Sequence, residues 1–457
     1  MKVVIAVHHF PPRYTSGAEL RAYRTASWLR DCGHDVHVVC IEHIDRGGRD
    51  GLTFADDTYD GLPVRRLSFN LLKAPDPFRW SYDNPWVGEC MRAYLAELQP
   101  DILHLISGYL MSGSTVCAAV EVRSSLERRI ATVVTLTDFW FLCPRITLLR
   151  SNGEVCAPPF DPVTCARCLG EEKRRYRAPG RLMPGLMQLY WQLRTDRSVQ
   201  VKDRMASLGR VMERVDAMIS PSRFLRDMFI RAGVAPDRIA FSRQGRDFPE
   251  LVPDLLQKSP ASRLRVGYMG QIEQHKGVHT LLQAVRKLPD VDLEVKVYGD
   301  PDQAPAYTRE LCRIMGGDPR IGLKGTYSRE EVSHVFHDLD VVVVPSIWYE
   351  NSPNTILEAF AHRTPVVASA LGGMAEMVQD GVNGLRFVPG DPASLAARLR
   401  QLVQDPGLLP RLRAGIGPVK SVAEEMAELL AIYDSLQEVS KGFLGGSGGK
   451  DEGVGAR

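Results

Sequence analysis

The chain has 457 residues, of which 44% are hydrophobic and 25% charged, and its formal net charge is +2. This length allows two or three globular domains, and the small net charge argues against a dedicated nucleic-acid binder. No apolar run is long enough to span a bilayer, and the apolar N-terminus is too short for a signal peptide. The nine cysteines argue against a disulfide framework, so we expect a reducing, cytoplasmic setting.

Short apolar strands alternate with helical segments in two separate blocks, which predicts an α/β fold with two doubly wound parallel sheets. The expected strands of the first block are residues 3–7, 35–40, 102–106 and 132–136, with a helix over 17–32. Those of the second block are residues 265–269, 293–298, 341–345 and 365–368. Ligands of such sheets bind at the carboxyl ends of the strands, so two facing domains would enclose one cleft.

We expect four parts along the chain. Residues 1–250 form an N-terminal, acceptor-side domain with a Cys-rich and helical insertion at about 139–210, and residues 251–420 form a donor-binding domain. A helix over 421–441 is expected to return to the first domain, and a Gly-rich tail over 442–457 to be disordered. The pair Asp56-Asp57 is assigned to a loop.

Four cysteines lie within 26 residues of the insertion and end in a C-x-x-C. They are Cys143, Cys156, Cys165 and Cys168. This spacing suits tetrahedral thiolate ligation of a structural zinc ion, and disulfides, an unoccupied reduced cluster and an iron–sulfur cluster remain as alternatives. Because the insertion follows Asp138 at a strand end, we expect it to shape the acceptor pocket.

A basic stretch, 173–181, precedes an apolar and aromatic one, 182–193. Positive charge beside such a helix fits contact with an anionic membrane surface. A helix packed on the core with a solvated basic face explains the same pattern.

Two glutamates, Glu350 and Glu358, bracket a predicted helix start directly after the strand 341–345. Ser352 suits the cap and Pro353 the first helical position. The next amides have no intrahelical acceptors and, with the helix dipole, would hold a diphosphate. These amides belong to Asn354, Thr355 and Ile356.

Several motifs in a fixed order carry a resemblance to a known family. They are His9-Phe-Pro-Pro-Arg13, Ser16-Gly17-Ala-Glu19, Gly270-Gln-Ile-Glu-Gln-His-Lys276-Gly277, Glu350 to Glu358, Gly372-Gly373-Met-Ala-Glu376 and Asp380-Gly-Val-Asn-Gly384. With them the chain resembles glycosyltransferase family 4, over nearly its whole length. The resemblance implies the GT-B architecture of two Rossmann-like domains facing a central cleft.

The resemblance also implies a reaction, namely retaining transfer of a hexosyl group from a nucleotide-diphosphate sugar to a glycan or lipid-linked acceptor. Such products belong to cell-surface polysaccharide or glycolipid. Glu350 would contact the donor sugar, Glu358 the ribose and Tyr327 the base. Lys276 would neutralise the diphosphate, and Gly17 would let the backbone approach it. No catalytic metal is expected, so we reject the string Asp338-Leu-Asp340 as a metal site.

Two positions depart from the family pattern. Gln271 replaces an arginine expected to bind the diphosphate, and Thr137 replaces a histidine near the reacting sugar. Asp138 and His104 are candidates for that polar role, although a hydrogen-bonded histidine at a strand end also explains His104. The departures keep an alternative open, a catalytically weak carbohydrate- or nucleotide-sugar-binding relative with a scaffolding role. Peripheral contact with the inner face of the membrane is a further expectation.

Overall fold

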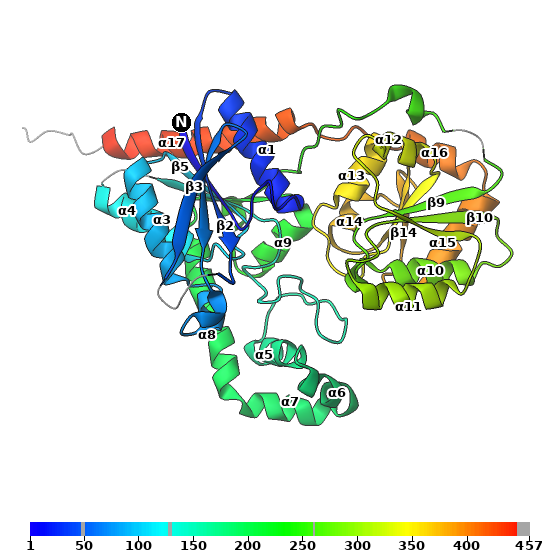
Figure 1. Ribbon diagram of the computed structural model, residues 1–457, viewed down its shortest axis with the longest axis horizontal. Coiled ribbons are helices and arrows are strands. Elements are labelled where there is room, and N and C mark those ends of the chain that lie inside the picture. Colours follow the sequence, from blue (N-terminus) through cyan, green and yellow to red (C-terminus); the bar gives the residue numbers. More distant parts are fainter. Residues whose placement is uncertain (47–50, 127–129, 259–260, 446–457) are drawn as a thin grey trace, which may run out of the picture.

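The computed structural model describes residues 1–46, 51–126, 130–258 and 261–445. It contains two α/β domains side by side, each built on a sheet with helices on both faces (Figure 1). The predicted α/β class with two parallel-sheet domains is therefore confirmed. The tail expected to be disordered was 442–457. Its first four residues instead belong to the last helix of the chain, and residues 446–457 lie outside the described residues.

The first sheet has the strand order β3-β4-β2-β1-β5-β6-β7-β8. Its strands are β1 (Lys2–Val7), β2 (Asp35–His43), β3 (Thr53–Tyr59), β4 (Leu62–Ser68), β5 (Ile102–Ile106), β6 (Ala131–Thr135), β7 (Ala217–Ser220) and β8 (Ile239–Phe241). The helices around it are α1 (Gly17–Asp31), α2 (Pro77–Trp80), α3 (Pro85–Leu98), α4 (Ser114–Leu126) and α9 (Arg223–Arg231). All neighbouring strands are parallel except β3 and β4.

The second sheet has the order β11-β10-β9-β12-β13-β14 and is parallel throughout. Its strands are β9 (Leu264–Met269), β10 (Leu293–Tyr298), β11 (Ile321–Gly325), β12 (Val341–Val344), β13 (Val366–Ser369) and β14 (Gly384–Phe387). Its helices are α10 (Val278–Arg286), α11 (Pro305–Met315), α12 (Val332–His337), α13 (Asn354–Ala361), α14 (Gly372–Met377), α15 (Pro392–Gln404) and α16 (Leu408–Ala414).

Strand β1 illustrates why successive residues of the strands are apolar. Val3 and Ile5 pack into the core under α1, while Val4 and Ala6 pack into the core on the other face. A parallel strand covered on both faces needs apolar residues at successive positions. The sheets therefore left a clear signal in the sequence.

The hairpin of β3 and β4 was not predicted. Asp56 and Asp57 lie in β3, where the expectation was a loop, and they form ion pairs with Arg65 and Arg66 of β4. Asp56 stands directly opposite Arg65 in the antiparallel ladder. Cross-strand charge pairs stabilise this edge in place of alternating apolar residues, so the pattern did not resemble a strand.

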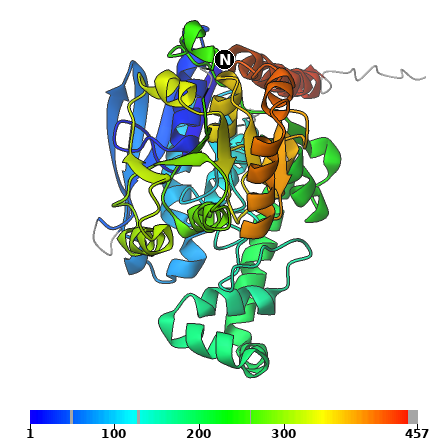
Figure 2. The ribbon, with the colours of Figure 1, turned by 90° about the vertical axis from the view of Figure 1, so that its right-hand side faces the viewer.

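Helix α17 (Val422–Gly445) crosses from the second domain back to the first (Figures 1 and 2). Its residues Met426, Leu429 and Tyr433 join the core between α1 and β1. Glu425 forms an ion pair with Arg21 of α1 at 2.5 Å. The two domains are thus joined by the linker after β8 and by this helix.

Asp340 has a structural role. Its carboxylate accepts hydrogen bonds from the backbone and guanidinium of Arg265, at 3.0 and 3.1 Å, and from Arg413 at 3.1 Å. These contacts tie the start of β12 to β9.

Candidate active site

A cavity of about 380 Å³ lies between the two domains. On the first domain its walls include His8, directly after β1, and Asp138, shortly after β6. On the second domain they include the segment that leads into α13. Both sheets thus contribute the carboxyl ends of their strands, where doubly wound folds bind ligands.

The first residues of α1 and α13 face each other across this cavity. A Cβ atom added to Gly17 would stand 4.0 Å from the side-chain nitrogen of Asn354. Both helices direct their first amides and the positive ends of their dipoles towards the space between them. An anion placed there would meet donors from both domains.

The start of α13 differs from the prediction in two ways. Pro353 occupies the cap position and the helix begins at Asn354, so Ser352 does not cap it. The Ser352 hydroxyl is instead buried without a hydrogen-bond partner among the described residues. The amide of Ile356 donates to the carbonyl of Pro353 at 3.1 Å, so only Asn354 and Thr355 retain amides available for a ligand.

Lys276 and Glu350 form one partly buried ion pair. Lys276 Nζ lies 2.7 Å from Glu350 Oε1, and the same oxygen accepts hydrogen bonds from Ser346 at 2.9 Å and from Trp348 at 2.8 Å. Burial alone would raise the pKa of Glu350, but the Lys276 charge and these hydrogen bonds hold that pKa below its ordinary value. Glu350 is therefore an ionised carboxylate, and its known contacts within the described part of the chain all fall on Oε1.

The loop that carries Lys276 is fixed by glycine. Gly277 has φ +72°, and a Cβ atom there would come within 2.0 Å of the carbonyl oxygen of Pro345. Only glycine allows this close approach between the loop and the end of β12. Gln271, earlier in the loop, has an exposed side chain, and its carbonyl accepts a hydrogen bond from Tyr268 at 2.6 Å.

Glu358 is paired with an arginine from the interdomain linker. Arg246 Nη2 lies 2.5 Å from Glu358 Oε1, yet burial raises the pKa of Glu358 above its ordinary value. Burial raises the pKa of the Tyr327 phenol, and the nearby charge of Glu358 raises it further. The ring of Tyr327 packs edge-on against Tyr298 at 5.5 Å. The structure thus brings the two residues proposed for ribose and base together.

Asp138 lies in the cleft, held by three donors. Ser107 and Thr137 donate their hydroxyls to its Oδ2 at 2.7 and 3.1 Å, and the amide of Trp140 donates to its Oδ1 at 2.8 Å. The carbonyl of Thr137 also accepts a hydrogen bond from Asn351 of the second domain, at 2.9 Å. The position of Asp138 is therefore fixed at the junction of the domains.

His104 lies outside the cleft, which removes it from the candidate reacting groups. It is 2% exposed, and its ring nitrogens are hydrogen-bonded to Tyr433 and Thr135, both at 2.7 Å. Burial lowers the pKa of His104 to about 3, with a smaller effect from the charge of Arg21. The alternative explanation, a hydrogen-bonded histidine at a strand end, matches these contacts.

Sequence reasoning missed a polar pair in the cleft, His8 and Glu19. His8 Nε2 lies 3.2 Å from Glu19 Oε1. Burial alone would raise the pKa of Glu19, but the contact with His8 holds it below its ordinary value. His8 Nδ1 and Glu19 Oε2 are buried without a partner among the described residues. The available signal was the position of His8, the first polar residue after a buried strand.

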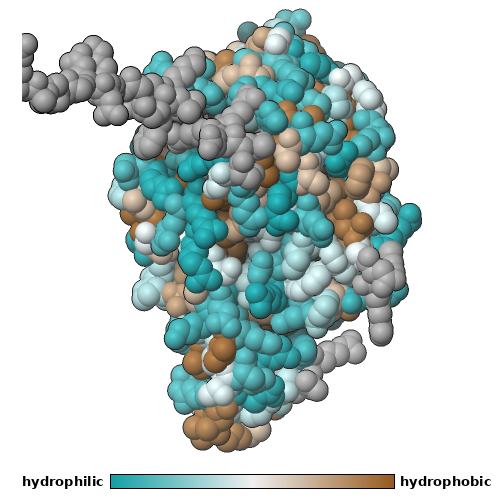
Figure 3. Space-filling model, turned by 90° about the vertical axis from the view of Figure 1, so that its left-hand side faces the viewer, coloured by the Kyte–Doolittle hydropathy of each residue, from teal (hydrophilic) through white to brown (hydrophobic). Residues whose placement is uncertain are grey.

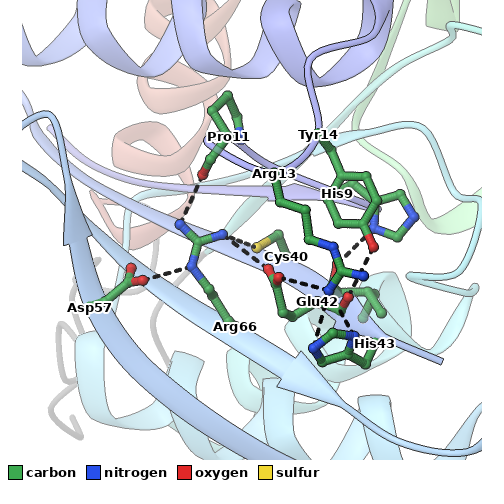
Figure 4. A network of polar contacts seen from close by, with 10 residues as sticks. His9, Pro11, Arg13, Tyr14, Cys40, Glu42, His43, Asp57 and Arg66 are labelled. Carbon is green, nitrogen blue, oxygen red and sulfur yellow. Dashed lines mark hydrogen bonds and ion pairs between the residues drawn. The ribbon is translucent and has the colours of Figure 1, made fainter. Parts of the chain in front are cut away.

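A polar network fixes the loop that leads to Gly17 (Figure 4). Arg66 donates to the carbonyl of Pro11 at 2.9 Å and to Asp57 at 2.7 Å. The ring of His9 stacks on that of Tyr14 with centroids 3.9 Å apart. The edge hairpin therefore positions the glycine of the cleft.

The predicted zinc site is not supported. The four cysteines of the insertion line one small cavity, but among the described residues no three His, Cys, Asp or Glu side chains are placed to hold a metal ion. Arg145 instead lies 3.3 Å from the sulfur of Cys168, and Arg150 3.3 Å from that of Cys156. Burial, with a smaller effect from the other three thiols, raises the pKa of Cys165 to about 12.

Comparison with known families decides the affiliation of the chain. A family model described as "Glycosyl transferase 4-like domain" matches residues 16–244, half of the chain, and one described as "Glycosyl transferases group 1" matches residues 263–405. The chain belongs to the glycosyl transferase 4-like family. The two matched regions correspond to the two sides of the cleft.

Curated relatives of this glycosyl transferase 4-like protein match it in part. The D-inositol 3-phosphate glycosyltransferase of Corynebacterium diphtheriae is 31% identical over 204 residues, which cover 41% of this chain and 47% of that protein. The enzyme of the same name from Xylanimonas cellulosilytica is 31% identical over 228 residues, 46% of this chain and 54% of its own. The chain thus spans about half the length of these relatives.

Solved structures resemble the protein over nearly its whole length. Anabaena HepE in complex with UDP has a TM-score of 0.63 at 19% identity and covers 95% of this chain and 100% of its own. Sucrose-phosphate synthase from Thermosynechococcus elongatus has a TM-score of 0.64 at 17% identity, with 96% and 100% covered. At such identities the likeness shows the fold alone, and that fold is GT-B, as predicted.

Proposed function

We propose that this protein is a retaining glycosyltransferase that moves a hexosyl group from a nucleotide-diphosphate sugar to a glycan or lipid-linked acceptor. One observation carries the proposal, the cavity in which the starts of α1 and α13 face each other across the two domains. Two helix N-termini form a ready site for a diphosphate. Membership of the glycosyl transferase 4-like family supports the same reaction class.

On the donor side, the diphosphate would accept hydrogen bonds from the amides of Asn354 and Thr355 and approach the backbone of Gly17. Glu350 Oε2 would accept a hydroxyl of the donor sugar, because Oε1 already receives Lys276, Ser346 and Trp348. The ammonium of Lys276 would offset negative charge on the departing phosphate as the glycosidic bond breaks.

On the acceptor side, Asp138, His8 and Glu19 line the cavity with polar atoms. The bond from the anomeric carbon to the phosphate oxygen breaks while the bond to the acceptor oxygen forms on the same face. The acceptor's proton passes to the departing phosphate, so no protein base is required and the anomeric configuration is retained. Positioning and electrostatics would then supply most of the rate acceleration.

The proposal also covers the donor, the product and the cellular location of the reaction. UDP and UDP-glucose are the first donors to test, because HepE of the same fold was solved with UDP and with UDP-glucose. The product would belong to a cell-surface polysaccharide or glycolipid made on the cytoplasmic side of the membrane. Gln271 has a neutral side chain where the family has arginine. We therefore expect Gln271 to affect the choice of donor.

A binding panel followed by turnover tests the proposal. The melting temperature is measured with UDP, GDP, ADP and their sugars, because a ligand of the native state raises it. Release of nucleotide from the donor that binds is then followed, with proton NMR of the anomeric centre of the product. Binding without hydrolysis or transfer to any acceptor would favour the scaffolding alternative. Absence of binding to every nucleotide of the panel would contradict the proposed transfer.

A further inference from the structure

Helices α5 (Pro162–Glu171), α6 (Arg174–Leu182) and α7 (Pro184–Leu193) form an arm with the first turns of α8 (Thr195–Arg214). The arm projects from the first domain, and α6 and α7 lie at its far end (Figure 1). Helix α7 packs on the other three helices of the arm. Its remaining face is exposed.

Helix α7 and the end of α6 carry two apolar faces. The inner face holds Met187 and Trp191, which are 7% and 3% exposed. Gly170 of α5 makes room for the indole, since a Cβ atom there would come within 2.0 Å of it. The outer face holds four leucines at the spacing of one helical stripe. They are Leu182, Leu186, Leu189 and Leu193, which are 79%, 59%, 53% and 73% exposed.

This leucine face gathers at the end of the molecule, where Figure 3 shows apolar residues at the tip of the arm. Scattered exposed leucines are ordinary on a protein surface, but here three lie on one stripe of α7 and a fourth ends α6 directly before it, so together they form a patch. The fold itself gains nothing from exposing them. Such a face is typical of a segment that is buried on contact with a partner.

The charge of the arm as a whole indicates the partner. Residues 173–200 contain seven basic side chains and one acidic one, although the whole chain has a net charge of only +2. Three of the basic residues, Lys173, Arg194 and Arg197, line a cavity of about 220 Å³ beside Trp191, on the inner side of the arm. A second copy of the chain would bring like charges together. An anionic surface with an apolar interior satisfies both the leucines and the basic residues.

We propose that the leucine face of the arm docks in the interface of an anionic lipid bilayer, with α7 lying along the surface. Helices with an apolar face and a basic rim sink only into the boundary between headgroups and acyl chains. Within the described ranges, none of the helices combines the length and the apolar character that a membrane span needs.

One loop connects the arm to the cleft. Ile146 lines the cleft cavity, and its neighbour Arg145 lies 3.3 Å from Cys168 Sγ on α5 and 3.2 Å from Glu172 at its end. Docking would therefore hold the cleft beside the membrane, where a lipid-linked acceptor resides. This consequence rests on the proposed glycosyl transfer, whereas docking itself does not.

Co-sedimentation of the full chain with vesicles tests the docking. Vesicles of phosphatidylcholine with about one third phosphatidylglycerol are compared with pure phosphatidylcholine, at low and at high salt. The test variant carries Leu186→Ser, Leu189→Ser and Leu193→Ser. Its control carries Val382→Ser, Val388→Ser and Val403→Ser, which alter three exposed apolar residues of the second domain. Circular dichroism melting confirms that both variants are folded.

We expect the unmodified chain to bind the anionic vesicles and to release them at high salt. The leucine variant should bind at least about ten-fold more weakly, and the valine control should bind as the unmodified chain does. Equal binding by the leucine variant, or no binding by the unmodified chain, would overturn the proposal. Self-association of the chain that the leucine variant abolishes would also overturn the proposal, since the leucine face would then join two copies. Hydrolysis of UDP-glucose in solution, measured in parallel, reports on the proposed function separately.

Discussion

The pair of Lys276 and Glu350 allows a sharp test of the proposed donor site. Lys276→Met removes the ammonium that lies 2.7 Å from Glu350 Oε1 but keeps the aliphatic stem. Removing one partner of a buried ion pair usually costs about 3–5 kcal/mol. Here the Lys276 side chain is 21% exposed, and Ser346 and Trp348 still donate to the carboxylate. We therefore expect a loss of about 1–3 kcal/mol in the free energy of unfolding.

The second variant, Glu350→Gln, separates stability from chemistry. The glutamine amide oxygen can still accept hydrogen bonds from Ser346 and Trp348. When Glu350→Gln is combined with Lys276→Met, neither position keeps a charge. The double variant should therefore recover most of the unfolding free energy that Lys276→Met loses. Its kcat/KM should nevertheless stay about a hundred- to a thousand-fold below that of the unmodified protein, because nothing neutralises the departing phosphate.

The assay combines urea denaturation with donor turnover for all four proteins of the cycle. If the double variant recovers kcat/KM together with stability, Lys276 is only a structural partner of Glu350 and does not act on the departing phosphate.

The pH dependence of the unfolding free energy gives a second check on the pair. Since the folded-state pKa of Glu350 is lowered, its contribution to stability is present above the ordinary carboxyl pKa and is lost as pH falls through the lowered value. Lys276→Met should remove this contribution.

Three further predictions follow from single positions. Gly17→Val should weaken donor binding by about ten-fold or more with little effect on stability, because its side chain would enter the space before Asn354. The unfolding free energy should fall as pH drops from 7 towards 5, because unfolded His104 takes up a proton while the folded residue, with a pKa of about 3, does not. His104→Asn should flatten this slope and leave donor binding unchanged. Iodoacetamide at pH 8 should modify exposed Cys312 well before Cys165, whose pKa is raised to about 12.

The Gly17 prediction has a matched control, and each prediction has an outcome that would contradict it. A Cβ atom at Gly209 on α8 would meet nothing within 4 Å, so Gly209→Ala should leave donor binding unchanged and raise stability by up to about 1 kcal/mol. A Gly17→Val variant with normal donor affinity would place the diphosphate elsewhere. An unchanged pH slope in His104→Asn would assign the slope to other groups. Rapid modification of Cys165, mapped by mass spectrometry, would show that it is a free and accessible thiolate and would contradict the raised pKa.

Much of the fold could be predicted because parallel strands buried on both faces leave a local pattern. The run Val341–Val344 is entirely buried, and so is Ile102–Ile106, which was predicted with the bounds that the structure has. The edge strand Thr53–Tyr59 was missed, since its six leading residues are exposed and its partners are charged. The approximate position of α13 was predictable from Pro353, although its first residue was not.

The candidate site was predictable residue by residue but not as a set of contacts. The sequence by itself determined two α/β domains, their strands and the glutamates beside α13, because local periodicity and helix-start chemistry are encoded in neighbouring residues. Only the tertiary structure decided that Lys276 pairs with Glu350, that His8 meets Glu19, and that His104 lies under Tyr433 of the last helix. Such pairs join residues up to 329 positions apart. Their choice depends on how strands and helices pack, and no local pattern records it.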